Sequence, residues 1–268
     1  MANDGQSTSD SSNTQVISLE EIEQTWKISA SNWLQSEFRK LDFTFHSLTS
    51  FERDESLIQT VNALLSALPT AGVHRQNDWE SGWGQNLEDL ERKSDETAII
   101  PKYFSKFNLV RWRQELVAPV HKNMEHQMLG FILDWISDEF LGDFSDIYEF
   151  GAGTGHNLLR FRKRHDSTTL WGLDWARSSQ NIIQRIAERR EDPNLRASYF
   201  DYFNPDETFL LTDSCAVVTV ASLEQIGTRF EPFLNYLMKN SPRLVIHIEP
   251  IGELLDQNNL MDYLSLEY

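Results

Sequence analysis

Hydrophobic and polar residues alternate with helical spacing in the first half of the chain. The stretch 18–41 starts with Ser18 and places Glu21 three residues later, which is typical of a capping box at a helix start. Between residues 55 and 68, apolar side chains recur every three or four positions and fall on one helical face. Both stretches therefore predict amphipathic helices.

The following stretches have a weaker pattern. Residues 76–93 hold Trp79 and Trp83 among glycines and acidic residues, and we expect a loop followed by a short helix there. Residues 101–144 have the spacing of two helical segments that are separated near Pro119. The first half of the chain is thus expected to be helical.

After Ile147 the pattern changes to short apolar runs that alternate with helix-like stretches. Such alternation predicts an α/β fold with a doubly wound, mostly parallel sheet, because each strand returns to the sheet through a crossover helix. The apolar runs are "IYEF", "LWGLD", "ASYFD", "AVVTVAS" and "RLVIHIEP".

These patterns divide the chain into three expected regions. Residues 1–16 are Ser-rich and lack both a basic start and an apolar core, so we expect a disordered tail and no secretory leader. Residues 17–140 form the expected helical cap that selects the substrate. Residues 141–268 form the expected α/β domain. Only 18 residues follow Pro250, so we expect either a sheet that stops at five strands or a chain that is a truncated product.

Charge and cysteine content narrow the possible partners. The formal charge of −17 disfavours nucleic acid and anionic membranes, because binding to phosphates requires a basic surface. No stretch has the ~20 apolar residues of a membrane span. Cys215 is the single cysteine, so no intramolecular disulfide can form, and we expect a cytoplasmic protein in which Cys215 packs in the core.

A metal site is not expected. His121 and His126 superficially resemble a metal-binding helix, but a spacing of five residues turns them about 140° apart on a helix. They would not share a face as an i, i+4 pair does.

The stretch "EFGAGTGHN" from Glu149 to Asn157 spends three of the chain's 12 glycines within five positions. A glycine-rich turn between a strand and a helix exposes backbone donors to a ligand. A phosphate-binding P-loop would place a Lys and a Ser or Thr after the last glycine, where this chain has His156 and Asn157. A dinucleotide fingerprint requires a small residue in place of His156, so an NAD(P)-dependent oxidoreductase is the weaker enzymatic alternative.

The spacing E-x-G-x-G-x-G resembles the first motif of class I S-adenosylmethionine-dependent methyltransferases. The resemblance covers residues 147–250, roughly two-fifths of the chain, and implies a sheet of order 3-2-1-4-5 that binds S-adenosylmethionine. It assigns cofactor contacts within the motif to Glu149, Gly151, Ala152, Gly153, Gly155 and Asn157.

The resemblance extends to the ends of the next strands. Asp174 ends the second strand, 23 positions after Gly151, where the family binds the ribose hydroxyls, and Trp175 follows where the family packs on adenine. At the third strand Asp201 and Tyr202 match the positions that contact adenine, and Ser222 closes the fourth strand. The alternative role for Asp174 is a helix N-cap, which is compatible with a ribose contact, and without the first two motifs Asp201 would be a turn residue.

The catalytic and acceptor-binding residues are less marked in the sequence. His247 and Glu249 are two residues apart on the fifth strand and therefore share a face. They either belong to a catalytic site or are buried core residues that satisfy their hydrogen bonds. Glu224 is the third candidate base. The residues expected to contact the acceptor are Tyr103, Arg111 and Arg113 in the cap. The tryptophans of the cap either line a substrate pocket or pack the helices together.

No signature for methylating nucleic acid is present, so the sequence favours a small-molecule acceptor. Methyl transfer from a sulfonium mainly requires alignment of donor and acceptor, and a base is needed only where the acceptor loses a proton. The non-enzymatic alternative is a methyltransferase-like domain that serves as a binding or regulatory subunit.

Overall fold

The structure is a computed structural model that describes residues 14–66, 70–93, 95–104 and 106–267. The expected tail over residues 1–13 lies outside the described residues. The chain forms two compact units. The first unit comprises residues 1–67, 105–128 and 256–268, and the second comprises residues 68–104 and 129–255.

This division differs from the expected boundary at residues 140 and 141. Residues 70–104 group with the parallel sheet rather than with the remaining N-terminal residues, and residues 256–267 group with the first unit. The cause is tertiary packing, because helix α4 (Gln76–Lys93) lies along α7 (Arg177–Arg190), and α9 (Leu260–Glu267) contacts α3 (Ser50–Leu64).

The first unit contains a four-stranded antiparallel sheet, so the expectation of an all-helical region is wrong there. The strand order is β1-β2-β4-β3. These strands are β1 (Thr14–Val16), β2 (Thr44–Ser47), β3 (Val110–Trp112) and β4 (Glu115–Pro119). Strand β1 also corrects the last residues of the expected tail, since Thr14 is paired with His46.

The β3–β4 turn explains why residues 110–119 are not helical. Arg113 and Gln114 have φ angles of 49° and 70°, the left-handed conformation at both centres of a two-residue hairpin turn. Besides α3 and α9, this unit contains the helices α1 (Leu19–Trp26) and α2 (Asn32–Phe38). The single helix expected over residues 18–41 is broken at Lys27, which has a φ of 56°.

The second unit carries the predicted parallel sheet. Its strands are β5 (Asp146–Phe150), β6 (Thr169–Asp174), β7 (Leu195–Tyr199), β8 (Cys215–Val220) and β9 (Leu244–Ile248). The order is β7-β6-β5-β8-β9 with every neighbouring pair parallel, which confirms the predicted fold class and the 3-2-1-4-5 order. The described part of this sheet has five strands.

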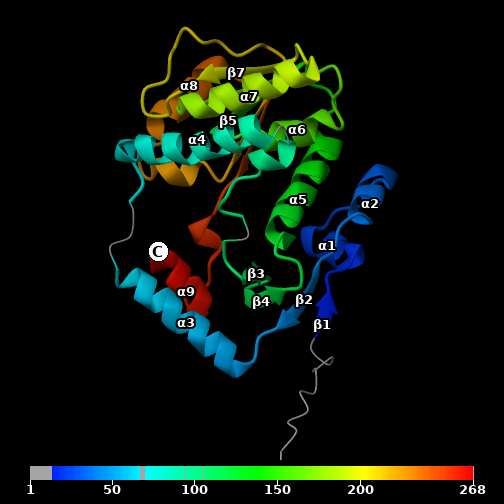
Figure 1. Ribbon diagram of the computed structural model, residues 1–268, viewed down its shortest axis with the longest axis vertical. Helices are drawn as coiled ribbons and strands as arrows, with labels where there is room; N and C mark the ends of the chain where they lie inside the picture. The colour runs from blue at the N-terminus through cyan, green and yellow to red at the C-terminus, as the bar shows by residue number, and fades with distance from the viewer. Residues whose placement is uncertain (1–13, 67–69, 94, 105, 268) are drawn as a thin grey trace, which may run out of the picture. The chain divides into compact units, whose positions relative to one another are not determined.

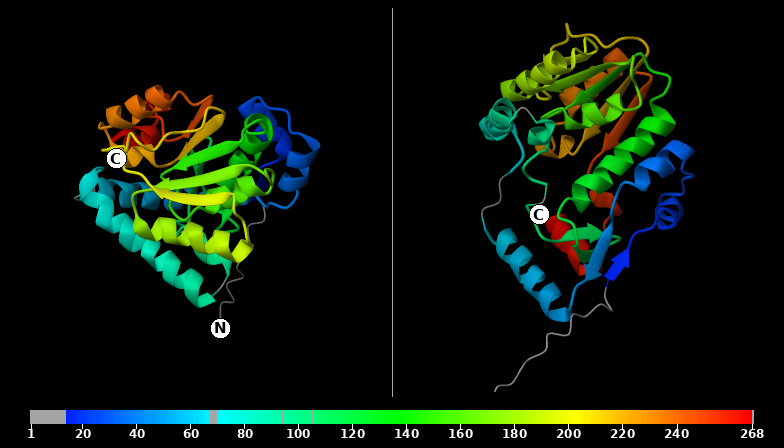
Figure 2. Two further views of the ribbon diagram at one scale, coloured as in Figure 1. Left: turned by 90° about the horizontal axis from the view of Figure 1, so that it is seen from above. Right: turned by 45° about the vertical axis from the view of Figure 1, so that its right-hand side comes forward.

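Alternate residues of the central strand face two separate cores. Ile147 packs with α4, α5 (Met124–Phe140), α6 (His156–Arg162) and α7 on one face, whereas Tyr148 and Phe150 pack with α8 (Glu231–Asn240) on the other. Figure 1 labels these elements, and the left view of Figure 2 shows α7 and α8 on opposite sides of the sheet. Short 3-10 helices η2 (Val73–Arg75), η3 (Glu96–Ile99), η4 (Leu223–Ile226) and η5 (Gly252–Leu254) complete the unit.

Helix α4 corrects the prediction of a loop and short helix over residues 76–93. It is continuous for 18 residues, because Trp83 and Leu90 are buried and Trp79 and Leu87 pack beside them on the same side. Its end is fixed to α7, since Arg189 Nη2 donates to the Leu90 carbonyl oxygen at 3.1 Å. This helix brings two tryptophans to the carboxyl end of the sheet.

Candidate functional site

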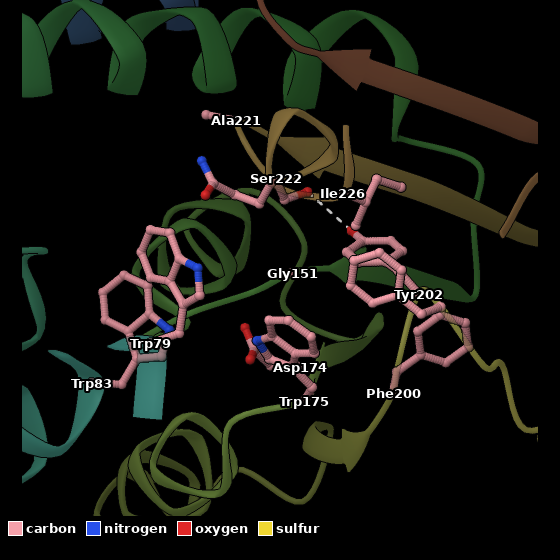
Figure 3. A pocket seen from close by; sticks show the side chains of 12 residues that line it. Trp79, Trp83, Gly151, Asp174, Trp175, Phe200, Tyr202, Ala221, Ser222 and Ile226 are labelled. Atoms are coloured by element: carbon pink, nitrogen blue, oxygen red, sulfur yellow. Dashed lines mark hydrogen bonds between the residues drawn. The ribbon is translucent and has the colours of Figure 1, made fainter. Parts of the chain in front are cut away.

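A cavity of about 530 Å³, including space open to solvent, lies at the carboxyl ends of the parallel strands (Figure 3). Ligands of doubly wound sheets bind at this edge, where the strand order reverses between β5 and β8. The lining residues are Trp79, Trp83, Gly151, Asp174, Trp175, Phe200, Tyr202, Phe203, Ala221, Ser222, Gln225 and Ile226.

The glycine loop between β5 and α6 lies at this edge of the sheet, and its Gly151 lines the cavity. Gly151 has a φ of 68°, and a Cβ placed there would lie 2.5 Å from Ser222 Cβ. Gly155 has a φ of 73° at the N-cap of α6, where a Cβ would lie 2.6 Å from Ile183 Cγ1. Both positions require glycine for the turn and for the close approach of a neighbouring side chain.

Glu149 lies behind the glycine loop and is almost completely buried. Asn157 Nδ2 donates to Glu149 Oε1 at 2.7 Å, which joins the end of β5 to the first turn of α6. Among the described residues, Glu149 Oε2 and Asn157 Oδ1 are buried without a hydrogen-bond partner. Burial raises the pKa of Glu149 to about 8, the nearby charge of Asp174 adds to the rise, and the Asn157 bond opposes it.

Asp174 ends β6 and connects the glycine loop to α7. Its Oδ2 accepts from the Gly153 backbone N–H at 2.9 Å, and its Oδ1 accepts from the Ala176 N–H at 2.8 Å. Burial raises the pKa of Asp174 to about 6, although these backbone donors act in the opposite direction. A carboxylate has about four acceptor directions, more than these backbone donors use, so the structural role and a ligand contact are compatible.

A carboxylate of α4 binds the start of α7. Glu80 Oε1 accepts from the Ser178 backbone N–H at 3.1 Å and also from the Ser178 hydroxyl. This contact satisfies free donors of the first turn of α7. It fixes α4, and therefore its tryptophans, next to the glycine loop, where Trp83 lies directly over Gly153.

Aromatic rings form two walls of the cavity, as Figure 3 shows for most of them. Trp79 and Trp83 stack with ring centroids 5.5 Å apart. Trp175 and Phe203 lie 5.7 Å apart on the side of β6 and β7. Planar apolar walls of this kind suit a flat aromatic ligand.

The segment after β8 closes a third side. The Tyr202 hydroxyl and Ser222 Oγ are 3.0 Å apart, and Ser222 Oγ also donates to the Phe150 carbonyl oxygen at 3.2 Å. Glu249 accepts from the backbone N–H groups of Ser222 and Leu223, each at 3.2 Å. Glu249 therefore holds the loop that carries Ser222.

The other two candidate bases make different contacts. His247 Nδ1 lies 2.8 Å from Thr219 Oγ1 on the neighbouring strand, and partial desolvation of this exposed residue lowers the pKa of His247. Glu224 has an exposed side chain that accepts from Gln225 Nε2 at 2.9 Å. Neither His247 nor Glu224 lines the cavity.

The expected acceptor contacts are dispersed. Tyr103 is half exposed, with its ring edge toward Trp83 at 6.4 Å. Arg111 and Arg113 belong to the first unit, where they pair with Asp262 and Glu21 respectively. Both guanidinium groups thus hold elements of that unit together.

Five of the predicted cofactor residues line the cavity together: Gly151, Asp174, Trp175, Tyr202 and Ser222. Asp201 does not line it, because its Oδ1 accepts from the Phe203 N–H at 2.8 Å and shapes the turn after β7. The sequence reasoning missed Phe200, Phe203 and Ile226. Phe200 and Phe203 come shortly after a strand end, as Trp175 does. This position in the sequence could have indicated that they line the cavity.

The described residues contain no group of three His, Cys, Asp or Glu side chains that could hold a metal ion. In the same part of the chain, no helix combines the length and apolar character that a membrane crossing requires.

No protein-family model and no curated protein sequence matches the chain. Among solved structures it is similar to the cyclase SpnF, with 15% identity over 69% of this chain and 60% of that one and a TM-score of 0.41. It is also similar to the plantazolicin methyltransferase BpumL in complex with SAH, with 13% identity over 72% of this chain and 71% of that one and a TM-score of 0.38.

A third similar structure is a putative S-adenosyl-L-methionine-dependent methyltransferase from Methanococcus maripaludis, with 16% identity over 52% of this chain, 61% of that one and a TM-score of 0.36. The chain spans about three-fifths of the length of this protein and of the cyclase. The strand order and the strand–glycine loop–helix connection are those of the class I methyltransferase fold, and that is the fold of the second unit.

Proposed function

We propose that the second unit binds S-adenosylmethionine and transfers its methyl group to a small-molecule acceptor by in-line displacement. The observation that carries the proposal is the meeting of Gly151, Asp174 and Ser222 in one cavity at the carboxyl ends of β5, β6 and β8. These are the positions at which the first motif and the following strand ends resemble the methyltransferase family.

The residues present fit this cofactor. Asp174 retains acceptor directions for the ribose hydroxyls, and the rings of Trp175 and Phe203 form a wall for adenine. The turn at Gly151 lacks a Cβ, so the polar groups of Ser222 and Tyr202 pack closely on the glycine loop at the cavity. Bound there, the sulfonium would supply the activated methyl group.

The protein's part in the proposed reaction is mainly alignment. In-line displacement gains most from holding donor and acceptor close and oriented. The contacts of Glu249 with the backbone of Ser222 and Leu223 make it a positioning residue for the loop after β8. We keep Glu224 and His247 as candidate bases that an acceptor with a leaving proton would require.

Titration calorimetry on the full chain tests the proposal with S-adenosylhomocysteine, S-adenosylmethionine and NADH. At pH 8, above the pKa of about 6, Asp174 is ionised and Asp174→Asn removes a charged acceptor of the same shape. We expect a loss in S-adenosylhomocysteine affinity of about 10- to 100-fold, the usual value of hydrogen bonds to a charged group.

Asp206→Asn is the matched control. Asp206 Oδ1 accepts from the Thr208 N–H at 2.9 Å in a similar local turn, but Asp206 does not line the cavity. This variant should bind S-adenosylhomocysteine with wild-type affinity. Binding of NADH alone would refute the proposal, and binding of the methyl donor without turnover across an acceptor panel would instead support the regulatory alternative.

A further inference from the structure

Arg75 lies at the rim of the cavity and contacts two of its lining side chains. Its guanidinium carbon lies 5.3 Å from the centroid of the Trp79 ring. Its Nη1 donates to Gln225 Oε1 at 3.1 Å. Trp79 comes from α4 and Gln225 from η4, so one cation joins two walls of the cavity.

The charge of Arg75 is weakly compensated. Its ion-pair partner is Asp78, whose Oδ2 lies 3.4 Å from Arg75 Nε and whose side chain is 66% exposed. By contrast, Arg160 Nε lies 2.8 Å from Asp134, whose side chain is completely buried. Within the described ranges, Arg75 Nη2 has no hydrogen-bond acceptor among protein side chains or carbonyl groups.

The backbone segment before Arg75 is held against η4. The Gly72 N–H donates to the Gln225 carbonyl oxygen at 3.1 Å. A Cβ on Gly227 would lie 3.4 Å from Ala71 Cβ, so the segment before Arg75 packs against the end of η4. The guanidinium is thus placed before any ligand arrives, and such preorganisation reduces the entropic cost of binding.

No lysine or arginine is among the residues that line the cavity, and the chain carries a formal charge of −17. An anionic ligand group therefore requires a cation at the rim. The planar fork of arginine matches a carboxylate in shape and charge.

We infer that Arg75 binds a carboxylate of the ligand held in this cavity. The carboxylate belongs either to the amino-acid end of the methyl donor or to an acidic acceptor. The inference rests on the proposed function, which it deepens by naming the anionic group that the site selects.

Calorimetry with two adenosine thioethers tests the donor as the source. S-adenosylhomocysteine carries the amino-acid carboxylate, and 5′-methylthioadenosine lacks it. If the donor supplies the carboxylate, Arg75→Gln weakens S-adenosylhomocysteine binding by about 10- to 100-fold and changes 5′-methylthioadenosine binding less than twofold. Arg75→Lys, which keeps the charge without the fork, should recover part of the loss.

A second pair of probes tests the acceptor as the source. With S-adenosylhomocysteine saturating, phenylacetate should bind and phenylacetamide should not, and Arg75→Gln should abolish the difference. Phenylacetate suits the aromatic walls. Arg243→Gln is the control, because its guanidinium carbon lies 5.3 Å from the centroid of the Phe144 ring, which does not line the cavity, and it should change neither pair more than twofold.

Equal losses for both thioethers in Arg75→Gln would show that Arg75 only holds Trp79 and Gln225 in place, and would overturn the inference. No change with any probe would do the same. If the wild type binds neither thioether, the proposed function fails. The phenylacetate pair on the ligand-free protein then decides the inference, with a loss in Arg75→Gln supporting it and equal binding or none overturning it.

Discussion

Replacing the buried carboxyl of Glu149 by an amide should remove most of the pH dependence of stability between pH 6 and pH 8. Glu149→Gln keeps the shape of the side chain and the bond from Asn157, but it cannot ionise. The substitution therefore removes the titration of a single carboxyl group in the second unit.

The sign follows from the raised pKa. Glu149 has a pKa of about 8 in the fold against an ordinary value of 4.5, so the folded state retains the proton that the unfolded state has lost. The resulting stabilisation is complete below about pH 4.5 and is lost as the pH rises through 8. Between pH 6 and pH 8, the free energy of unfolding of the wild type should fall by about 2 kcal/mol.

Urea denaturation followed by tryptophan fluorescence and far-UV circular dichroism at pH 6, 7 and 8 measures this fall. Asp174 titrates mainly below this range and is present in both proteins, so the difference between them reports on Glu149. Glu188→Gln, which alters a side chain that is 53% exposed, should keep the wild-type slope. Parallel pH profiles for the wild type and Glu149→Gln would show that Glu149 is ionised in the fold, and would refute the reasoning.

Three further predictions follow from the same unit. Gly155→Ala places a Cβ 2.6 Å from Ile183 Cγ1 at a φ of 73°, and urea denaturation should show a loss of about 2 kcal/mol or more. Glu80→Ala removes the acceptor for the Ser178 N–H and should cost about 1 kcal/mol in the same measurement, an effect that would be absent if α7 were capped by solvent alone. Burial raises the pKa of the Cys215 thiol to about 11, so Ellman's reagent should react at the rate of unfolding, and immediate reaction in native buffer would contradict this burial.

The parallel sheet was predictable because its information is local. Each strand is a short apolar run that ends in polar or glycine residues, and the glycines after β5 are required by backbone angles that side chains disfavour. The positions of Asp174 and Ser222 followed from their place at strand ends. Parallel strands bring such ends to one edge of the sheet.

The helical prediction for the remaining chain was less accurate for a physical reason. Helix α4 has few apolar residues, and it is continuous because Trp83 and Leu90 are buried against a distant part of the chain. The β3–β4 hairpin depends on two left-handed residues without glycine, which no local propensity indicates.

The sequence by itself determined the strand and helix order from β5 to β9, the glycine loop and the acidic residue that ends β6. Only the tertiary structure decided that Arg111 pairs with Asp262, that Glu249 holds the Ser222 loop, and that Arg75 contacts Gln225, 150 residues further along the chain. Backbone angles and hydrophobic periodicity are set within a few residues, whereas the partner of a charged side chain depends on which segments packing brings together. The fold of the sheet could therefore be predicted, and the charges around its cavity could not.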